Sequence, residues 1–415
     1  MAQEKKYIPE LRFPEFKNDG GWILETIGTI ADTFSGGTPT VGNREYYGGD
    51  IPFIRSGEIS NDKTELFITE SGLSNSSARM VDKGTILYAM YGATSGEVAI
   101  SKISGAINQA ILAIIPKKQE YNSRYIYHYL KHNKQYILSK YLQGGQGNLS
   151  ANIINNLPIY LPCDSEGKVS IKEQQKIADC LSSLEEYINV TKQKVYQLKE
   201  HKKGLMQRLF PYNGKTMPDI RFPEFYDEVA WTITKNDCVI KTITPPKKLS
   251  SSEYKVNGKY PIVDQSINFI AGYSDDETAV VHNEDNDYVV FGDHTCILKR
   301  VNFPFIQGAD GVKIFTSKYS DLLTLYIYQY MCAHPIMSKE YKRHFSDLRE
   351  QEFIYPKKME EQEKIAQSLL SLDEIILAYE NKVSTMERHK KALMQQLFPQ
   401  LKFSCHVNKQ NSARD

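Results

Sequence analysis

Two short segments of the chain resemble parts of catalytic sites, but neither is complete. Gly214-Lys215-Thr216 has the ending of a phosphate-binding loop, yet Leu209 stands where that loop requires its first glycine. Residues 156–160, Asn-Leu-Pro-Ile-Tyr, resemble the Asn-Pro-Pro-aromatic element of amino-methyltransferases but lack its paired prolines and a glycine-rich cofactor loop. We therefore expect this chain to bind no cofactor of its own.

The carboxylates and histidines show no recognisable metal-site spacing. A Glu-x-Lys triplet, half of a metal-dependent nuclease site, occurs at 253–255, but it recurs at 200–202, 340–342 and 380–382 and so carries little information. No histidine pair has the His-x-x-x-His spacing with a neighbouring acid that zinc sites use. The sequence predicts no catalytic residue and no metal ligand. A nuclease using Asp237 and Glu253 is kept as an alternative.

Composition limits the class of protein further. The 415 residues are enough for two or three domains, and 51 Lys and Arg against 50 Asp and Glu leave a net charge of +1, unlike a strongly basic nucleic-acid binder. The six cysteines contain no Cys-x-x-Cys pair, which argues against a zinc ribbon or a disulfide framework. No apolar run is long enough to span a membrane. We expect a soluble, cytoplasmic protein with no membrane partner.

Internal repeats dominate the sequence. PELRFPEF at 9–16 returns as PDIRFPEF at 218–225, and the two tryptophans, Trp22 and Trp231, have the same offset. A longer segment, EQQKIADCLSSLEE…HKKGLMQRLFP at 173–211, returns at 361–399 with about half of its positions identical. Residues 23–155 and 232–350 show no convincing similarity to each other. The chain therefore alternates variable and constant segments.

Each constant segment is predicted to form one long helix with an apolar seam. Apolar residues alternate by four and three from Ile177 to Leu209, and in the same register from Ile365 to Leu397, which is typical of a coiled coil. Pro211 and Pro399 should end the helices. About 37 residues at ~1.5 Å per residue would make a rod of ~55 Å.

Chain order predicts how these helices pair. The second variable region lies between the end of one helix and the start of the other, so a compact domain there requires antiparallel helices. The chain thus resembles a cyclic dimer of one repeated unit, cut open, with a pseudo-two-fold axis. Lys202 and Lys390 occupy equivalent seam positions. They either fix the register of the coiled coil or lie where the seam frays and both amines reach water.

The variable regions are predicted to be mixed α/β or largely β. Short apolar runs such as 51–54, 85–88 and 288–291 are separated by glycines, as in brief strands joined by turns. Each region ends in a helical stretch, at 124–141 and at 322–341. The expected fold class is α/β (α+β), with two variable domains separated by two long helices that form an antiparallel coiled coil.

This alternation of two divergent domains with two near-copies of a helix resembles the specificity subunit of Type I restriction-modification systems, from about Pro9 to Pro399. Short motifs at 36–39, 51–55, 84–87 and 107–110, and at 260–266, 291–295 and 308–311, resemble target recognition domains of that family. The resemblance implies target recognition domains at 1–160 and 212–356, constant helices at 161–211 and 357–399, and a tail at 400–415.

The resemblance also implies a function. The chain would have no catalytic activity of its own. It would read a bipartite double-stranded DNA target with an unread spacer and would scaffold two methyltransferase subunits, through which restriction subunits attach. S-adenosylmethionine and ATP would bind to those partners. A standalone DNA-binding protein or coiled-coil adaptor remains the alternative, and it predicts a chain that binds DNA tightly by itself.

Candidate DNA contacts are polar or basic residues in glycine-broken loops, since Arg and Lys suit guanine and Asn and Gln suit adenine. In the first region these are Thr38, Thr40, Asn43, Arg55, Arg79, Asn108, Gln109, Gln143, Gln146 and Asn148. In the second they are Lys247, Lys248, Gln265, Ser266, His294, Thr295, Lys313, Arg343, His344 and Arg349. An ordinary role in a turn or on the surface is the alternative for each, and for His294 a structural loop role is the simpler interpretation.

Candidate contacts to partner subunits lie near the ends of both constant helices. They occur in matching positions, as two identical partners would require: His201, Lys202, Lys203, Leu205, Met206 and Phe210, and His389, Lys390, Lys391, Leu393, Met394 and Phe398. The alternative is that the basic residues only complement the helix dipole.

Overall fold

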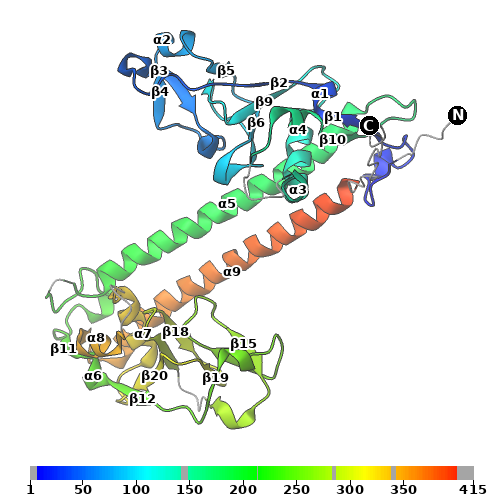
Figure 1. Ribbon diagram of the computed structural model, residues 1–415. Helices are drawn as coiled ribbons and strands as arrows, with labels where there is room; N and C mark the ends of the chain where they lie inside the picture. The colour runs from blue at the N-terminus through cyan, green and yellow to red at the C-terminus, as the bar shows by residue number, and fades with distance from the viewer. Residues whose placement is uncertain (1–6, 142–147, 213, 283–286, 338–342, 400–415) are drawn as a thin grey trace, which may run out of the picture. The chain divides into compact units, whose positions relative to one another are not determined.

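The computed structural model describes residues 7–141, 148–212, 214–282, 287–337 and 343–399. It divides into two compact units, Met1–Val190 with Lys382–Asp415, and Thr191–Asn381. Both boundaries fall inside long helices, α5 (Ile171–Leu209) and α9 (Met359–Leu397). Each unit therefore contains one variable region and part of each long helix (Figure 1). We call residues 23–161 the first head and residues 232–355 the second head.

The first head contains two four-stranded sheets and a two-stranded ribbon. Its strands are β1 (Ile23–Thr26), β2 (Ala31–Ser35), β3 (Tyr47–Ile54), β4 (Leu66–Ile68), β5 (Arg79–Val81), β6 (Ile86–Ala89), β7 (Val98–Ile100), β8 (Gly105–Ile107), β9 (Ile111–Pro116) and β10 (Pro158–Leu161). Its helices are α1 (Ile27–Ile30), α2 (Glu70–Ser74), α3 (Ser123–Tyr141) and α4 (Ala151–Asn155), with 3-10 turns η2 (Arg44–Tyr46), η3 (Ser56–Glu58) and η4 (Gly92–Thr94); η1 (Pro14–Phe16) precedes the head.

Alternation along β6 explains how the layers of the first head pack. The sheet β2-β9-β6-β7 lies between α3 and the second sheet, β4-β3-β8-β5. Ile86 and Tyr88 belong to the core with α3, whereas Leu87 and Ala89 belong to the core between the sheets. Successive side chains of a strand point to opposite faces, so a strand buried on both faces must be apolar throughout.

The second head has its own set of elements. Its strands are β11 (Thr232–Lys235), β12 (Ile240–Ile243), β13 (Lys248–Leu249), β14 (Tyr260–Val263), β15 (Gly272–Ser274), β16 (Val280–Val281), β17 (Tyr288–Gly292), β18 (Leu298–Val301), β19 (Phe305–Gly308), β20 (Val312–Ser317) and β21 (Glu352–Tyr355). Its helices are α6 (Asn236–Val239), α7 (Thr324–Ala333) and α8 (Phe345–Glu350), with η6 (Ser251–Glu253) and η7 (Glu277–Ala279); η5 (Pro223–Phe225) precedes the head.

The two heads share one topology despite their different sequences. The order β12-β20-β17-β18 in the second head matches β2-β9-β6-β7 in the first, and the ribbon β11-β21 matches β1-β10. In the other sheet, β14 and β19 pair in parallel as β3 and β8 do. The mixed α/β expectation and the three strand predictions are confirmed, whereas the predicted closing helices are followed by a further short helix and a strand in each head.

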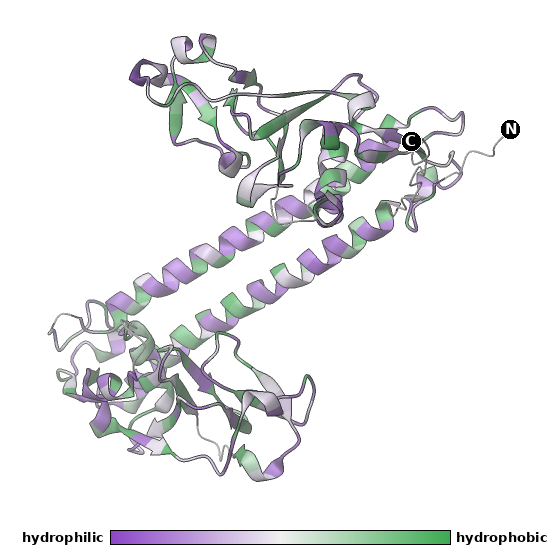
Figure 2. Cartoon of the chain, in the orientation of Figure 1, coloured by the Kyte–Doolittle hydropathy of each residue, from purple (hydrophilic) through white to green (hydrophobic). Residues whose placement is uncertain are grey.

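The apolar seams of the long helices are confirmed. Every predicted seam position from Ile177 to Leu209 and from Ile365 to Leu397 is buried or half-buried, and apolar residues recur along both helices in Figure 2. Both helices end one residue before a Phe-Pro pair, as expected for proline. In unit 2, Lys199 binds Glu380 at 2.7 Å and Lys202 binds Asp373 at 2.6 Å, so rising numbers on α5 meet falling numbers on α9. The helices are antiparallel, as predicted.

The two seam lysines are paired, which excludes the fraying alternative. Lys202 Nζ contacts both carboxylate oxygens of Asp373, and Lys390 Nζ lies 3.0 Å from Glu185 Oε2 in unit 1. Glu185 and Asp373 occupy equivalent positions in the repeat, so the same ion pair forms twice. Lys131 of α3 also binds Glu185, and burial would raise the pKa of that carboxyl, but Lys131 and Lys390 lower it to about 2.

The phenylalanine that follows each long helix is buried in a head. In unit 1, the ring of Phe398 lies 5.6 Å from Tyr125 and 5.5 Å from Tyr129. In unit 2, Phe210 lies 5.7 Å from Tyr326 and 5.6 Å from Tyr330. Such edge contacts stabilise aromatic clusters beyond the burial of area alone. The repeated Leu-Phe-Pro ending is thus part of the core of both heads.

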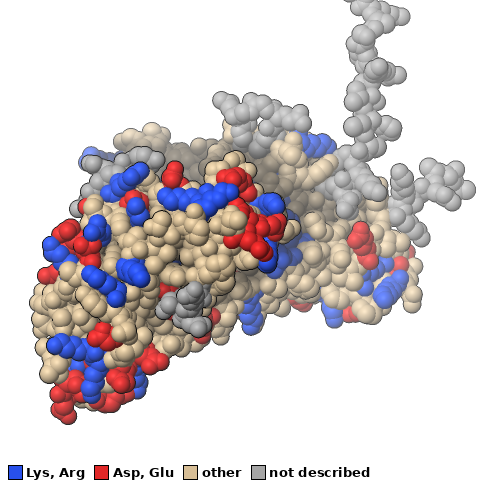
Figure 3. Space-filling view, turned by 90° about the horizontal axis from the view of Figure 1, so that it is seen from below, with Lys and Arg blue, Asp and Glu red and all other residues tan. Residues whose placement is uncertain are grey.

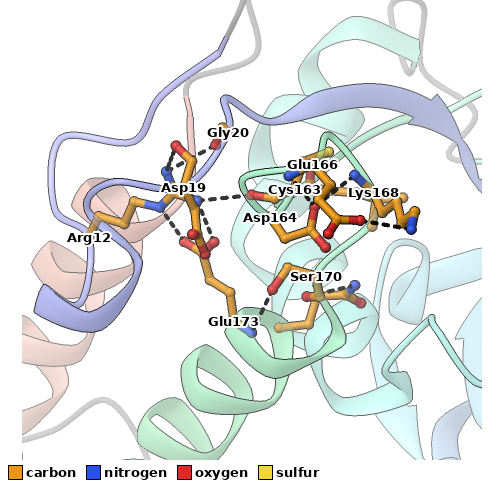
Figure 4. Close-up of polar contacts among 11 residues, drawn as sticks. Arg12, Asp19, Gly20, Cys163, Asp164, Glu166, Lys168, Ser170 and Glu173 are labelled. Carbon is orange, nitrogen blue, oxygen red and sulfur yellow. Dashed lines mark hydrogen bonds and ion pairs between the residues drawn. The ribbon is translucent and has the colours of Figure 1, made fainter.

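The repeated Arg-Phe-Pro-Glu-Phe segment binds the start of the helix that follows each head. Arg12 donates to both carboxylate oxygens of Glu173, at 2.7 and 2.6 Å, and to the backbone oxygens of Asp19, Gly20 and Cys163 (Figure 4). In unit 2, Arg221 binds Glu361 in the same way, at 2.6 and 2.7 Å. Both carboxylates are fully buried. The repeated Arg and Glu therefore close the two ends of each head onto one another.

We predict that Glu185→Gln lowers the free energy of unfolding by about 2 kcal/mol at pH 7, because the half-buried Lys390 and the more exposed Lys131 would lose their carboxylate. Because the pKa of Glu185 is lower in the folded chain than its unfolded value near 4.5, its ionised carboxylate stabilises the fold. This stabilisation is fully present above pH 4.5 and is lost as the pH falls through about 2. The difference from wild type, measured by urea unfolding, should therefore shrink between pH 4.5 and 2. Glu186→Gln, on the exposed neighbour, should cost less than ~0.5 kcal/mol.

We also predict that Phe398→Ala and Phe210→Ala each destabilise the fold by about 3 to 5 kcal/mol, because each leaves a cavity among buried tyrosines. Thermal unfolding of the full chain measures the effect. The exposed neighbours serve as matched controls, and Gln395→Ala and Gln207→Ala should have little effect. Equal stability of Phe398→Ala and Gln395→Ala would contradict the role given to this ring.

Candidate nucleic-acid interface

Three polar candidates of the first head leave one sheet at the same edge. Strands β3 and β8 pair in parallel with Ile54 opposite Ile107, so Arg55 and Asn108, the next residues, emerge side by side. Strand β5 runs antiparallel to β8 and begins at Arg79, opposite Ile107. The register of the sheet therefore brings Arg55, Arg79 and Asn108 together, although they are far apart in the sequence.

The loop that follows β2 adds to this edge. Thr38 Oγ1 donates to Gln109 Oε1 at 2.6 Å, and the guanidinium of Arg79 lies 3.8 Å from the centre of the Phe34 ring. Thr38, Arg55 and Asn108 line one hollow of about 420 Å³. The other residues of that hollow are Val41, Arg44, Tyr47, Phe53 and Leu66. Thr38, Arg55, Asn108 and Gln109 thus form one cluster.

Arg55 is held in a fixed orientation by acidic neighbours. Its Nε and Nη2 atoms donate to the Glu58 carboxylate at 2.9 and 3.1 Å, and Nη2 also donates to Glu65 Oε2 at 2.6 Å. These hydrogen bonds raise the pKa of Arg55, and the bond from Arg55 lowers the pKa of Glu58 to about 2. These bonds use the Nε hydrogen and both Nη2 hydrogens, so Nη1 is the group of Arg55 that could donate to a base.

Three candidates of the second head also lie together. Gln265 accepts a hydrogen bond from the backbone N–H of His294 at 3.4 Å, and Thr295 Oγ1 donates to the Gln265 carbonyl at 2.9 Å. Gln265 Nε2 donates to the backbone oxygen of Asp310 at 3.2 Å, and Lys248 Nζ lies 3.9 Å from the Asp310 carboxylate. Ser266 instead donates to Asp264 within its own loop.

The remaining candidates do not join these clusters. Lys247 binds Asp276 at 2.7 Å, Arg349 binds Asp237, and Lys313 lies 5.6 Å from the Phe345 ring. Asn43 caps the turn η2 through the N–H of Glu45. Thr40, Asn148 and Arg343 are exposed, while Gln143 and Gln146 lie outside the described residues.

His344 is a correction to the candidate set. Its side chain is 1% exposed, its ring lies 3.1 Å from the Asp347 carboxylate, and its backbone N–H donates to the Asp293 carbonyl. A buried ring cannot reach a base edge, so we remove His344 from the proposed contacts.

Sequence reasoning also missed the polar residues Arg44, Asn61 and Lys63, which line hollows with Arg55. Their position in glycine-broken loops was the signal that could have identified them.

The candidate partner contacts fall into two groups. Met206, Phe210, Met394 and Phe398 are buried, Leu205 and Leu393 are half-buried, and Lys202 and Lys390 are held in the ion pairs with Asp373 and Glu185. His201, Lys203, His389 and Lys391 are exposed. Tyr187 and Ile375, at equivalent positions of the repeat, are also exposed, at 43% and 44%. The exposed residues are the ones that a partner can touch without unfolding a head.

The described residues provide no support for the nuclease alternative. Glu253 accepts hydrogen bonds from the N–H and hydroxyl of Ser250 in a turn, and Asp237 binds Arg349. Across the described ranges, no three His, Cys, Asp or Glu side chains are grouped so that they could hold a metal ion. In the same part of the chain, no helix has the length and apolarity needed to cross a membrane.

Basic and acidic side chains are interspersed on the surface. In the view of Figure 3, Lys and Arg are scattered among Asp and Glu, with no extended patch of one sign. Several basic candidates are already paired with carboxylates, including Arg55, Lys247 and Arg349. These ion pairs reduce the positive charge that the candidate residues offer to a partner.

Comparison with known proteins finds similarity to specificity subunits. Residues 20–200 match the family model of the Type I restriction modification DNA specificity domain. The Type I restriction enzyme MjaIX specificity subunit of Methanocaldococcus jannaschii is 28% identical over 256 residues, which are 58% of this chain and 57% of that protein. The EcoR124I/EcoR124II specificity subunit of Escherichia coli is 26% identical over 174 residues, 40% of this chain and 41% of that protein. The chain thus matches little more than half the length of the first relative, and less of the second.

A solved structure extends the similarity to both halves of the chain. The crystal structure of the Type I restriction-modification system S subunit from M. genitalium matches with a TM-score of 0.67 and 17% identity, over 95% of this chain and 100% of that one. At this identity the similarity establishes a common fold. Residues 20–200 therefore match the DNA specificity domain family of Type I restriction-modification systems, and the chain as a whole shares the fold of this solved S subunit.

Proposed function

We propose that this chain is the DNA-recognition subunit of a Type I restriction-modification complex and reads a bipartite target. The observation that carries the proposal is the pair of heads with one topology and different edge residues. Two reading domains on matching helices suit two unrelated short sequences separated by an unread spacer, because each head reads bases and the scaffold sets their spacing. A spacer set by the length of α5 and α9 is part of this proposal.

The chemistry of the two edges supports different half-sites. The first head presents Arg55 with Asn108 and Gln109, which suit guanine and adenine. The second head presents Gln265 with His294 and Thr295. Each set contains donors and acceptors that can discriminate base edges in the major groove.

The matched surfaces of the long helices support a second role, scaffolding two methyltransferase subunits. His201 and Lys203 on α5 correspond to His389 and Lys391 on α9, and Tyr187 corresponds to Ile375. Two copies of one partner require such matched surfaces. Restriction subunits would join through the methyltransferases, and S-adenosylmethionine and ATP would bind to partner subunits. The chain itself would carry out no catalysis and would act on DNA in the cytoplasm.

The proposal predicts a bipartite methylation motif that requires both components. The chain is expressed with and without a methyltransferase subunit of this family, and methylated adenines are mapped across the genome. A motif with two half-sites should appear only when both are present. Methylation that is unchanged by the chain would contradict the proposal, and tight DNA binding by the chain alone would favour the standalone alternative.

Exchange of residues 23–155 for another head should change one half-site and leave the other unchanged.

Partner docking makes a separate prediction. Lys203→Glu should weaken the binding of one methyltransferase subunit by roughly tenfold, and Lys391→Glu should do the same for the other, because reversed charges oppose a complementary surface. Native mass spectrometry should then find one bound partner for each single variant and none for the double variant. Lys172→Glu is the control, since this exposed lysine corresponds to Glu360 and is not part of the matched set. Full assembly of the double variant would contradict docking at these residues.

A further inference from the structure

In both heads, the loop after the central strand of the second sheet is organised around a buried ion. The loop of the first head follows β3 and comprises residues 55–65, and the loop of the second follows β14 and comprises residues 264–270. These strands are equivalent, since each pairs in parallel with the strand that supplies the neighbouring edge residues. Each loop carries a candidate DNA contact, Arg55 in the first and Gln265 in the second.

In the first head the ion is the carboxylate of Glu58, whose side chain is 10% exposed. It accepts hydrogen bonds from the backbone N–H of Glu65 at 3.0 Å, from the backbone N–H of Arg55 at 3.3 Å and from the Arg55 guanidinium. The hydroxyl of Thr64 lies 3.2 Å from the same carboxylate. One side chain thus joins the first residue of the loop to its last two.

In the second head the ion is the ammonium of Lys299 on β18, whose side chain is 4% exposed. Its Nζ donates to the backbone oxygens of Asp264 at 2.7 Å and Asn268 at 2.6 Å, and it lies 3.9 Å from the Asp264 carboxylate. Asp264 in turn accepts hydrogen bonds from the N–H and hydroxyl of Ser266. A buried charge is stable only when its hydrogen bonds are satisfied, so Lys299 fixes the path of the loop.

The two heads use opposite charges at different positions. Strand β6 of the first head is equivalent to β17 of the second, and Leu87 pairs with Ala99 as Val290 pairs with Lys299. The first head therefore has Ala99 at the place of Lys299, and Ala99 packs in the apolar core between the sheets. In the second head, the residue four after the end of the strand, at the place of Glu58, is Ile267, and it is 89% exposed. Neither ion is a shared requirement of the fold, because each head folds without the other's ion.

The side chains that each loop presents are accessible. Arg55, Asn61 and Lys63 line one hollow of about 550 Å³ in the first head. In the second head, Asn268 and Ile267 are exposed beside Gln265. A recognition loop that is already ordered loses less conformational entropy on binding and presents its donors in one geometry, which increases discrimination between bases.

We propose that Glu58 and Lys299 are positioning residues for DNA recognition, each determining the specificity of one half-site by holding a loop and without touching the DNA. This inference rests on the proposed function. The heads are held independently, so the loss of one ion should relax one half-site and leave the other intact.

The test uses the chain assembled with its methyltransferase subunits and genome-wide adenine methylation as the readout. Glu58→Gln places amide N–H groups against the Arg55 donors, and Lys299→Met removes the ammonium at nearly constant volume. Methylation at sites with a changed base in the affected half-site should rise roughly tenfold relative to wild type, the range expected for one lost base contact. The other half-site should keep its sequence, and the two variants should affect different half-sites.

Matched controls separate positioning from general destabilisation. Arg300→Met removes the ion pair of Arg300 with Asp287, at 2.9 Å, from the residue beside Lys299 on β18, and Glu97→Gln removes the ion pair with Lys134 from the first head. Both should leave the two half-sites unchanged. Glu58→Asp and Lys299→Arg keep each ion with a changed reach. They should show a smaller loss confined to the same half-site, and they keep the test decisive if a stronger variant fails to assemble.

Three outcomes would overturn the inference: no change in either half-site in any of the four variants, equal loss at both half-sites, or the same relaxation in the Arg300 and Glu97 controls. Failure of the proposed function is distinguishable, because the wild-type complex would then show no bipartite motif before any variant is compared.

Discussion

The buried ion pair between the repeated arginine and glutamate is the interaction on which the architecture depends. Arg12 and Glu173, like Arg221 and Glu361, join the segment before a head to the helix after it. The adjacent glutamines complete the same closure: Gln174 bonds to backbone groups of Glu120 and Asn122, and Gln362 to those of Asp321 and Leu323. Removing one partner of a buried pair leaves an uncompensated charge, so both halves of each repeat must be kept together.

This closure joins residues that are far apart in the sequence. Features of the fold that follow local rules could be predicted from the sequence, whereas features that depend on such distant contacts could not. The seam from Ile177 to Leu209 was predictable because a helix brings residues three and four apart onto one face, and Pro211 ends it by a local rule. The roles of Phe210 and Phe398 were not, since their tyrosine partners are more than a hundred residues away. A matched Leu-Phe-Pro ending was interpreted as a partner surface, whereas most of it packs inside the heads.

The candidate site was predictable to a similar extent and for the same reason. Arg55 and Asn108 were identified by residue type and by nearby glycines, but their proximity follows from the parallel pairing of β3 with β8, which is a non-local contact. His344 has the same residue type as many base-contacting residues and is nevertheless buried. Lys299 was not identified at all, because a lysine within an apolar strand gives no indication of which backbone oxygens it will bind. The common topology of the heads was hidden because only their hydrophobic alternation, and not their side chains, is shared.

The near-neutral charge of the chain gains a physical explanation from these contacts. Nonspecific affinity for DNA comes largely from basic residues that displace counterions along the phosphate backbone. In this chain Arg55 is bound by Glu58 and Glu65, Lys247 by Asp276 and Arg349 by Asp237, so several basic candidates are already paired within the chain. Carboxylates that hold a guanidinium in one orientation weaken its attraction for phosphate, but they also fix the direction of the donors that remain. Under the proposed function, in which partner subunits supply phosphate contacts, the first effect could be tolerated and the second would be useful. Under the proposed function, the acidic residues beside the candidate contacts favour sequence discrimination over affinity.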